Sequence, residues 1–179
     1  MGESSYEIDV RSILTDLGGT LQLDADVAIP VLTLGAEEFA PVAPGHLEAT
    51  VTNTGAGIVA AGTVQVDARA ECSRCLRPFV LRVTGDLEGF YVAPGAEADL
   101  PDEQEYGFVR EGSIDIMDAA LAALALELPF APVHATDCAG ICPTCGADLN
   151  EATCSCPPAE STSPFAALKT LLPEDGRDR

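Results

Sequence analysis

The sequence predicts an α+β fold, in which an antiparallel β-sheet or partly open barrel is covered by one helix and followed by a cysteine-rich region and a short C-terminal helix. Three observations predict this fold. Strand-like alternation dominates the first half of the 179-residue chain, a helical apolar period appears over residues 115–128, and five of the seven cysteines lie within residues 137–156. We expect a β-rich core over residues 1–130, a metal-binding region over 131–160 and a helical tail over 161–179.

The N-terminal part of the chain predicts two strands. Glu7 to Leu14 and Thr20 to Ile29 carry alternating or β-branched apolar residues, which suit a strand with one buried face. Gly18 and Gly19 between them are a turn signal. The two segments are therefore predicted to be successive strands joined by a turn.

The centre of the chain predicts three longer strands. Apolar and polar side chains alternate from His46 to Thr52, Ile58 to Ala70 keep an apolar face, and Phe79 to Val92 alternate again. Residues 53–57 supply turn chemistry between the first two. The pair Cys72-Ser-Arg-Cys75 consequently lies at the tip between two long strands.

After these strands the chain first becomes acidic and then helical. Residues 93–105 contain five acidic residues, two prolines and no basic residue, which predicts a flexible surface loop with little to bury. Apolar residues in 115–128 then step by four, three and four positions, which predicts a helix that covers the sheet and ends at Pro129. Asp115 suits the helix cap and Asp118 the positive end of the dipole. The predicted apolar stripe consists of Met117, Leu121, Leu124 and Leu128.

A second, shorter helix is predicted near the C-terminus. Ser163 and Pro164 suit its start, because serine caps helices and proline favours the first helical position. Its apolar stripe consists of Phe165, Leu168 and Leu172, and Pro173 ends it. The last six residues, EDGRDR, are expected to be disordered.

The C-terminal cysteines predict a zinc knuckle. In Cys142-Pro-Thr-Cys145-Gly, two thiolates project from a tight turn whose amides face the sulfurs, and Cys154-Ser-Cys156 adds a second pair. Four thiolates form a tetrahedral shell, for which zinc is the usual occupant. Reversible redox thiols and an iron–sulfur cluster are the alternatives.

The remaining cysteines predict a second zinc ion. Cys72, Cys75 and Cys138 need a fourth ligand to close a structural site, and His134 lies four residues before Cys138. In an alternative partition, Cys72 and Cys75 would share a metal with Cys142 and Cys145, and the others would bind with His134. Either arrangement joins the strand tip to the C-terminal region.

We do not expect an enzyme, because thiolates dominate the predicted ligand sets and a hydrolytic zinc keeps an open position for water. His46-Leu-Glu48 together with Cys142 and Cys145 has a limited likeness to the zinc deaminase signature. That likeness fails at Ile141, where the signature has proline, and the segment at His46 reads as a strand. No small-molecule substrate is expected.

The charge balance favours a basic partner. Twenty-nine acidic residues against nine basic ones give a formal net charge of −20, which repels naked nucleic acid at long range. The basic residues nevertheless gather around the first cysteine pair, where they either are solvated on a strand face or make a local contact with a phosphate, such as that of RNA, or with a carboxylate. This arginine group consists of Arg69, Arg74, Arg77 and Arg82.

Composition also bears on the compartment. The N-terminal residues show no basic start followed by an apolar stretch, and the longest apolar run, Ala119 to Leu126, is far too short for a membrane span. We therefore expect a soluble, cytoplasmic protein with no membrane partner. In a reducing cytoplasm, clustered cysteines favour metal binding or redox chemistry over disulfides.

The chain resembles the YceD family of large ribosomal RNA subunit accumulation proteins. The resemblance depends on "CSRCLRPF", "ELPFAPVHATDCAGICPTCGADLNEATCSC" and "SPFAALKTLL", and it places the seven cysteines at the family's metal-like positions. His134 stands where many relatives have another cysteine. The resemblance implies a role in accumulation or processing of large-subunit ribosomal RNA, for which we expect a basic ribosomal protein or the RNA itself as partner. A thiol-based redox or metal-responsive switch is the alternative function.

Overall fold

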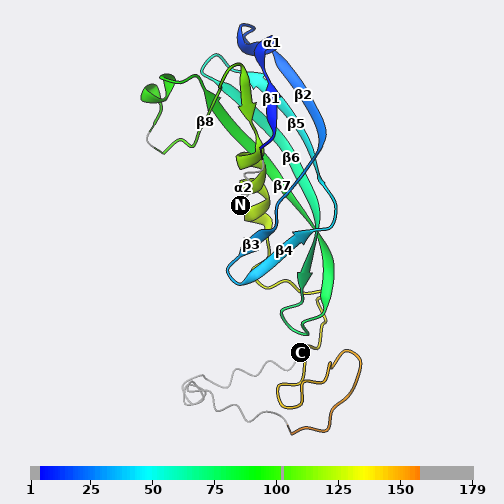
Figure 1. Cartoon of the computed structure of the whole chain (residues 1–179). Coiled ribbons are helices and arrows are strands. Elements are labelled where there is room, and N and C mark those ends of the chain that lie inside the picture. The colour runs from blue at the N-terminus through cyan, green and yellow to red at the C-terminus, as the bar shows by residue number, and fades with distance from the viewer. Residues whose placement is uncertain (1–4, 102, 158–179) are drawn as a thin grey trace, which may run out of the picture.

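The computed structural model describes residues 5–101 and 103–157. Figure 1 shows an elongated molecule, in which a long sheet carries helix α2 on one face and ends at the cysteine-rich segment. The predicted C-terminal helix of residues 161–179 lies outside the described residues.

The sheet is built around one long antiparallel hairpin. Strand β6 (Ile58–Glu71) pairs with β7 (Pro78–Val92) along its whole length, so both strands reach the tip that carries the first cysteine pair. The remaining strands of the sheet extend it on both sides of this hairpin. They are β2 (Thr20–Val27), β3 (Leu32–Leu34), β4 (Glu37–Pro41), β5 (Gly45–Asn53) and β8 (Gly107–Phe108).

The sheet is open, which agrees with the first of the two predicted arrangements, an antiparallel sheet, whereas the alternative, a partly open barrel, does not form among the described strands. Strands follow the order β2, β5, β6, β7 and β8, and the hairpin of β3 and β4 joins β6 beyond the end of β5. All pairings are antiparallel except that of β8 with the end of β7. Closure would require β2 to pair with β7 or β8, and no such pairing occurs among the described strands.

The predicted strand over Glu7 to Leu14 is only half correct. The structure has a short strand β1 (Glu7–Asp9), which pairs with β9 (Ser113–Asp115), followed by the helical turn α1 (Arg11–Leu14). The buried side-chain amide of Asn53 donates hydrogen bonds to the carbonyls of Ile13 and Leu14, at 2.7 and 3.0 Å. A partner distant in sequence therefore stabilises a turn that the local apolar pattern does not reveal.

Helix α2 (Met117–Glu127) covers β7, as Figure 1 shows. The Asp115 carboxylate accepts hydrogen bonds from the amides of Met117 and Tyr6, at 3.0 and 2.9 Å, and thereby caps the first turn. Met117, Leu124 and Leu128 are buried, whereas Leu121 is only partly buried. Ala120 and Ala123 complete the buried face instead.

Small residues allow this helix to approach the sheet closely. A Cβ atom at Gly85 of β7 would lie 2.4 Å from the carbonyl oxygen of Ala123. The backbone of α2 therefore rests directly on a glycine, which no larger residue could replace without displacing the helix.

The acidic segment 93–105 connects β7 to β8 through one short 3₁₀ turn, η1 (Ala96–Asp99). Its described part has no longer helix or strand, in line with the loop prediction. In the described part of the chain, no helix is long and apolar enough to cross a membrane.

His46 is expected to titrate above its ordinary value. Its ring nitrogens lie 3.3 Å from Asp26, 3.6 Å from Glu48 and 3.7 Å from Asp24, and the hydrogen bond to Asp26 is the main factor that raises its pKa. A raised folded-state pKa stabilises the fold below pH ~6.5, and this contribution is lost as pH rises through the folded value. NMR titration of the imidazole should show the shift, and Asp26→Asn should reduce it. An unchanged titration in that variant would contradict the assignment.

Candidate metal sites

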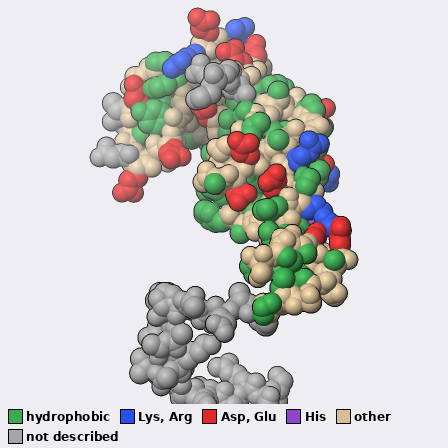
Figure 2. Space-filling model, turned by 60° about the horizontal axis from the view of Figure 1, so that its bottom comes forward, with side chains coloured by type: hydrophobic (Ala, Val, Ile, Leu, Met, Phe, Trp, Pro, Cys, Tyr) green, Lys and Arg blue, Asp and Glu red, His purple; other side chains and the backbone are tan. Residues whose placement is uncertain are grey.

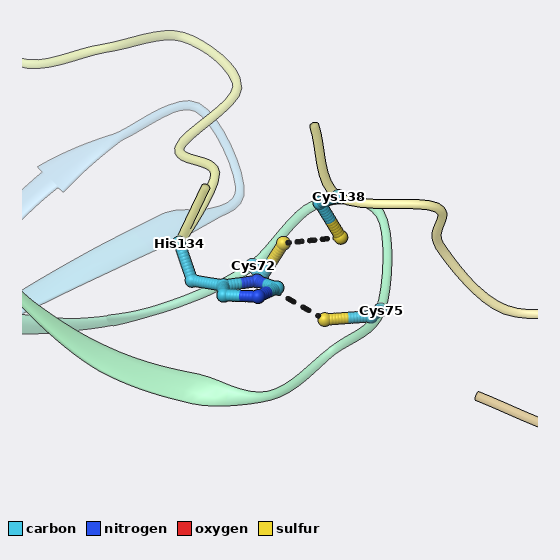
Figure 3. A group of neighbouring side chains, drawn as sticks. All are labelled: Cys72, Cys75, His134 and Cys138. Carbon is cyan, nitrogen blue, oxygen red and sulfur yellow. Dashed lines mark hydrogen bonds between the residues drawn. The ribbon is translucent and has the colours of Figure 1, made fainter. Parts of the chain in front are cut away.

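The first cluster joins the hairpin tip to a segment that follows α2. Figure 3 shows the Cys72 and Cys75 thiols and the His134 imidazole converging with the Cys138 thiol. Cys72 and Cys75 come from the turn between β6 and β7, and His134 and Cys138 from the chain after α2. The three cysteines are at most 7% exposed.

The spacing of these ligand atoms fits a tetrahedral zinc shell. The Sγ atoms of Cys72 and Cys138 lie 3.8 Å apart, and Cys75 Sγ lies 3.4 Å from His134 Nδ1. A tetrahedron with zinc–sulfur bonds of about 2.3 Å has sulfur–sulfur edges of about 3.8 Å and slightly shorter sulfur–nitrogen edges. All four ligand atoms lie within 4.8 Å of one another. The group can therefore surround one metal ion without rearranging.

The tip itself has the backbone of a metal knuckle. The Cys72 amide donates to the Arg77 carbonyl at 2.9 Å, and the Leu76 amide donates to the Cys72 carbonyl at 2.8 Å. This turn requires a left-handed residue after the second cysteine, and Leu76 takes that conformation with a φ of 60°. Leucine is unfavourable in this region, so the surrounding contacts must hold it there.

The environment favours a thiolate at Cys72. Burial opposes its ionisation, but hydrogen bonds from the side chain and backbone of His134 and from the amides of Cys75 and Arg74 outweigh burial and lower the pKa of Cys72 to about 5. Burial, followed by the neighbouring sulfurs of Cys72 and Cys138, raises the pKa of Cys75. A divalent cation among these sulfurs would relieve the second effect, because its charge stabilises all of the thiolates together.

The second cluster repeats the knuckle with a different partner pair. The thiols of Cys142, Cys145, Cys154 and Cys156 lie within 4.8 Å of one another. The Cys142 amide donates to the Ala147 carbonyl and the Gly146 amide to the Cys142 carbonyl, each at 2.8 Å, as in the first knuckle. Gly146 supplies the left-handed residue, with a φ of 73°. Here the sequence provides the residue that this turn prefers.

Backbone donors also favour ionisation in this second cluster. Hydrogen bonds from the amides of Cys145 and Thr144 lower the pKa of Cys142 to about 6. The Cys145 sulfur and then burial raise the pKa of Cys156 to about 12. One thiolate therefore forms readily, and the fourth requires a cation for compensation, as in the first cluster.

The structure groups the eight predicted ligands as four and four. The first set contains His134 and the second contains only cysteines, whereas the partition that joined Cys72 and Cys75 to Cys142 and Cys145 does not occur. His46, considered in the deaminase comparison, belongs to neither set.

Four arginines were predicted to contact RNA or another anion. Two of them, Arg74 and Arg77, instead form hydrogen bonds with the cysteine-rich segment. Arg74 donates to the carbonyls of Thr136 and Cys138, at 3.3 and 3.0 Å, and its own carbonyl accepts from the Ile141 amide. Arg77 donates to the carboxylates of Asp148 and Glu151, at 2.9 and 2.5 Å. Arg74 and Arg77 therefore contribute to an internal interface.

The other two arginines lie on the sheet. Arg82 makes a bidentate pair with Asp67 across β6 and β7, at 2.8 and 2.9 Å. Arg69 is exposed and forms no ion pair or side-chain hydrogen bond with another described residue. Figure 2 shows basic side chains along one edge of the molecule.

Sequence reasoning missed the residues around the ligands. The Asn150 side chain donates to the Cys138 sulfur at 3.5 Å and accepts from the Ala139 amide at 2.8 Å. Asp148 and Glu151 are the carboxylates that pair with Arg77. Asp148 and Asn150 have the composition of a turn, but their contacts with residues 12 and 71 positions away leave no local signal.

Comparison with known proteins assigns the chain to a family. The family model described as large ribosomal RNA subunit accumulation protein YceD matches residues 60–172, which include both cysteine clusters. The chain belongs to the YceD family. The YceD match begins within β6 and covers the hairpin, α2 and the cysteine-rich segment.

One of the curated relatives that match carries the YceD name. An uncharacterized protein of Mycobacterium tuberculosis is 38% identical over 104 residues, 58% of this chain and 50% of the relative. An uncharacterized protein of Mycobacterium leprae is 33% identical over 108 residues, 60% of this chain and 50% of the relative. The large ribosomal RNA subunit accumulation protein YceD of Haemophilus influenzae is 30% identical over 119 residues, 64% of this chain and 65% of the relative. The chain spans about half the length of the mycobacterial relatives that it matches. No solved structure matches.

Proposed function

We propose that this YceD protein is a non-enzymatic factor that supports accumulation of large-subunit ribosomal RNA in the cytoplasm. The observation that carries this proposal is membership of a family named for that role. Loss of the protein should lower the ratio of large-subunit to small-subunit ribosomal RNA, which electrophoresis of total RNA measures. An unchanged ratio during growth would contradict the proposal.

In this proposal both clusters hold structural zinc. Four ligands from each cluster complete a tetrahedral shell, which leaves no coordination position for a water nucleophile. Cys145 alone of the seven cysteines is exposed. Cys72, Cys75, Cys138 and Cys142 are buried, and Cys154 and Cys156 are partly buried, which supports a structural role over a redox switch, since sensor thiols need access to oxidant.

The partner in this proposal is a basic large-subunit ribosomal protein. A net charge of −20 attracts a basic protein and repels RNA, and three of the four arginines considered for RNA contact already donate to acceptors within the chain. Arg69 remains as the candidate for an RNA contact. Protein binding is therefore the better supported mode.

The proposed partner class predicts steep salt dependence. Immobilised full-length protein should retain purified basic large-subunit ribosomal proteins at about 50 mM salt and release them at about 500 mM, because the Debye length shortens several-fold. Purified large-subunit ribosomal RNA, tested in the same way, should bind weakly, and Arg69→Ala should not change retention of the proteins. Salt-independent retention, or preferential binding of RNA that Arg69→Ala weakens, would contradict this mode.

A further inference from the structure

A groove lies between the first half of α2 and the open end of the β6–β7 hairpin, opposite the tip that carries Cys72 and Cys75. It has a volume of about 710 Å³, within the range of ligand pockets in proteins. Its walls come from β1, the end of β7, β8, β9 and α2, and from the loop before β8. It shares no residue with either cysteine cluster.

Acidic side chains dominate the charge of this groove. Five carboxylates line it against a single basic residue, Arg110. The ion pairs among the described residues include none of these five. The carboxylates are those of Glu7, Glu88, Glu105, Asp115 and Asp118. Among these five carboxylates, Asp115 alone has a structural role that the described contacts show, because it accepts a hydrogen bond from the first turn of α2.

Aromatic rings also line the groove. Tyr106 and Phe108 meet edge to face with ring centroids 5.5 Å apart, and the Arg110 guanidinium lies 5.7 Å from the centre of the Phe108 ring. The groove thus already displays one guanidinium against an aromatic face, which is the geometry of a cation–π contact.

Tyr91 provides an independent sign that the groove is a binding site. Its side chain is 5% exposed, and a Cβ atom at Gly89 or Gly107 would lie 2.8 or 2.6 Å from its ring. The Tyr91 hydroxyl has no hydrogen-bond partner among the described residues. Every fully buried side-chain oxygen in that part of the chain has such a partner, so the Tyr91 hydroxyl is not fully buried. The hydroxyl therefore reaches the open space of the groove that Tyr91 lines.

The charges around Tyr91 agree with this picture. Burial, and then the negative charges of Asp115 and Asp118, raise the pKa of Tyr91 to about 12. The same negative potential favours a cationic group in the groove.

We propose that this groove binds an extended, arginine-rich segment of a partner protein. Its carboxylates pair with guanidinium groups, its aromatic rings stack on them, and the Tyr91 hydroxyl is free to bond with the segment. Arginine suits such a site better than lysine, because the planar guanidinium both pairs bidentately with carboxylates and stacks on rings. This inference rests on the proposed function, in that it gives the basic ribosomal protein a docking site.

The test uses the full-length chain and a fluorescein-labelled hexaarginine peptide, with hexalysine as the comparison. The groove variant combines Glu88→Gln, Glu105→Gln and Asp118→Asn. Its matched control combines Asp16→Asn, Glu38→Gln and Asp86→Asn, which removes three carboxylates that are also exposed, lie outside the groove and form no ion pair with another described residue. Fluorescence anisotropy at about 100 mM salt gives the dissociation constants.

The groove variant should bind hexaarginine about tenfold more weakly, because three exposed ion pairs are lost together. The control variant should change the affinity less than about twofold, and the unmodified chain should prefer hexaarginine to hexalysine by several-fold. Equal weakening by the two variants would overturn the proposal, because binding would then follow total charge. An unaffected groove variant, or equal affinity for the two peptides, would also overturn it.

A second measurement needs no variant. Titration of ¹⁵N-labelled protein with hexaarginine should shift the amide signals of Gly89 and Gly107, and shifts confined to other regions would overturn the proposal.

The groove proposal and the proposed function can be tested separately. If ribosomal proteins bind the groove variant normally, the groove assignment fails and the proposed function stands. If hexaarginine binds the groove but no ribosomal protein binds the chain, only the proposed partner fails.

Discussion

Replacing Cys72 and Cys75 together with serine is expected to lower bound zinc from two ions per chain to one and to release the cysteine-rich segment from the hairpin tip. A structural zinc site contributes about 10 kcal/mol or more of binding free energy at neutral pH, so this is the largest single effect that we expect. Metal analysis of purified protein gives the stoichiometry. Hydrogen exchange should show faster exchange at Ile141 and Ser73, whose amides donate across this interface to the carbonyls of Arg74 and Pro132.

A matched variant separates the two sites. Replacing Cys154 and Cys156 with serine should also remove one ion, but it should leave the first cluster and its docking contacts in place. Two ions retained after loss of Cys72 and Cys75, or no metal in the unmodified protein, would contradict the assignment. Chelation of the unmodified protein should remove both metal ions, which combines the effects of the two variants, and should make the buried thiols reactive.

Gly85→Val is expected to destabilise the fold by about 3 kcal/mol, the upper part of the usual range for overpacking. The new side chain would begin 2.4 Å from the Ala123 carbonyl oxygen and 2.5 Å from its carbon, so the backbone of α2 must move away from β7. Urea denaturation gives the change in the free energy of unfolding.

Asp86→Ala is the control for this prediction. Asp86 is the next residue of β7 and is exposed, so its truncation should change the free energy of unfolding by less than about 0.5 kcal/mol. A Gly85→Val protein as stable as the control would show that the helix does not rest on this glycine.

Local sequence patterns predicted the parts of the fold that local interactions determine. Strand alternation located β5, β6 and β7 closely, and the apolar period located α2 to within two residues at each end. Alternation left open whether the sheet closes into a barrel, because closure depends on pairing between the edge strands β2 and β8, which lie far apart in the strand order. The turn α1 was missed because its stabilising contact comes from Asn53.

The candidate metal sites were predictable for a similar reason. Each knuckle is a short turn whose cysteine spacing is visible in the sequence, whereas the pairing of the knuckles with His134 or Cys154 depends on the folded chain. Arg74 and Arg77 show the limit most clearly. Their clustering in sequence resembles an anion-binding patch, yet their acceptors lie 62 to 74 residues away in the same chain.

The first cluster also connects residues far apart in sequence, since Cys75 meets His134 across 59 positions and Cys72 meets Cys138 across 66. A metal ion bound there would cross-link the chain and close a loop that contains β7, α2 and the residues between them. Confining an unfolded chain in a loop of this size removes conformational entropy equivalent to about 4 kcal/mol. In a compartment that keeps thiols reduced, the metal would thus perform the task that a cystine bridge performs outside the cell.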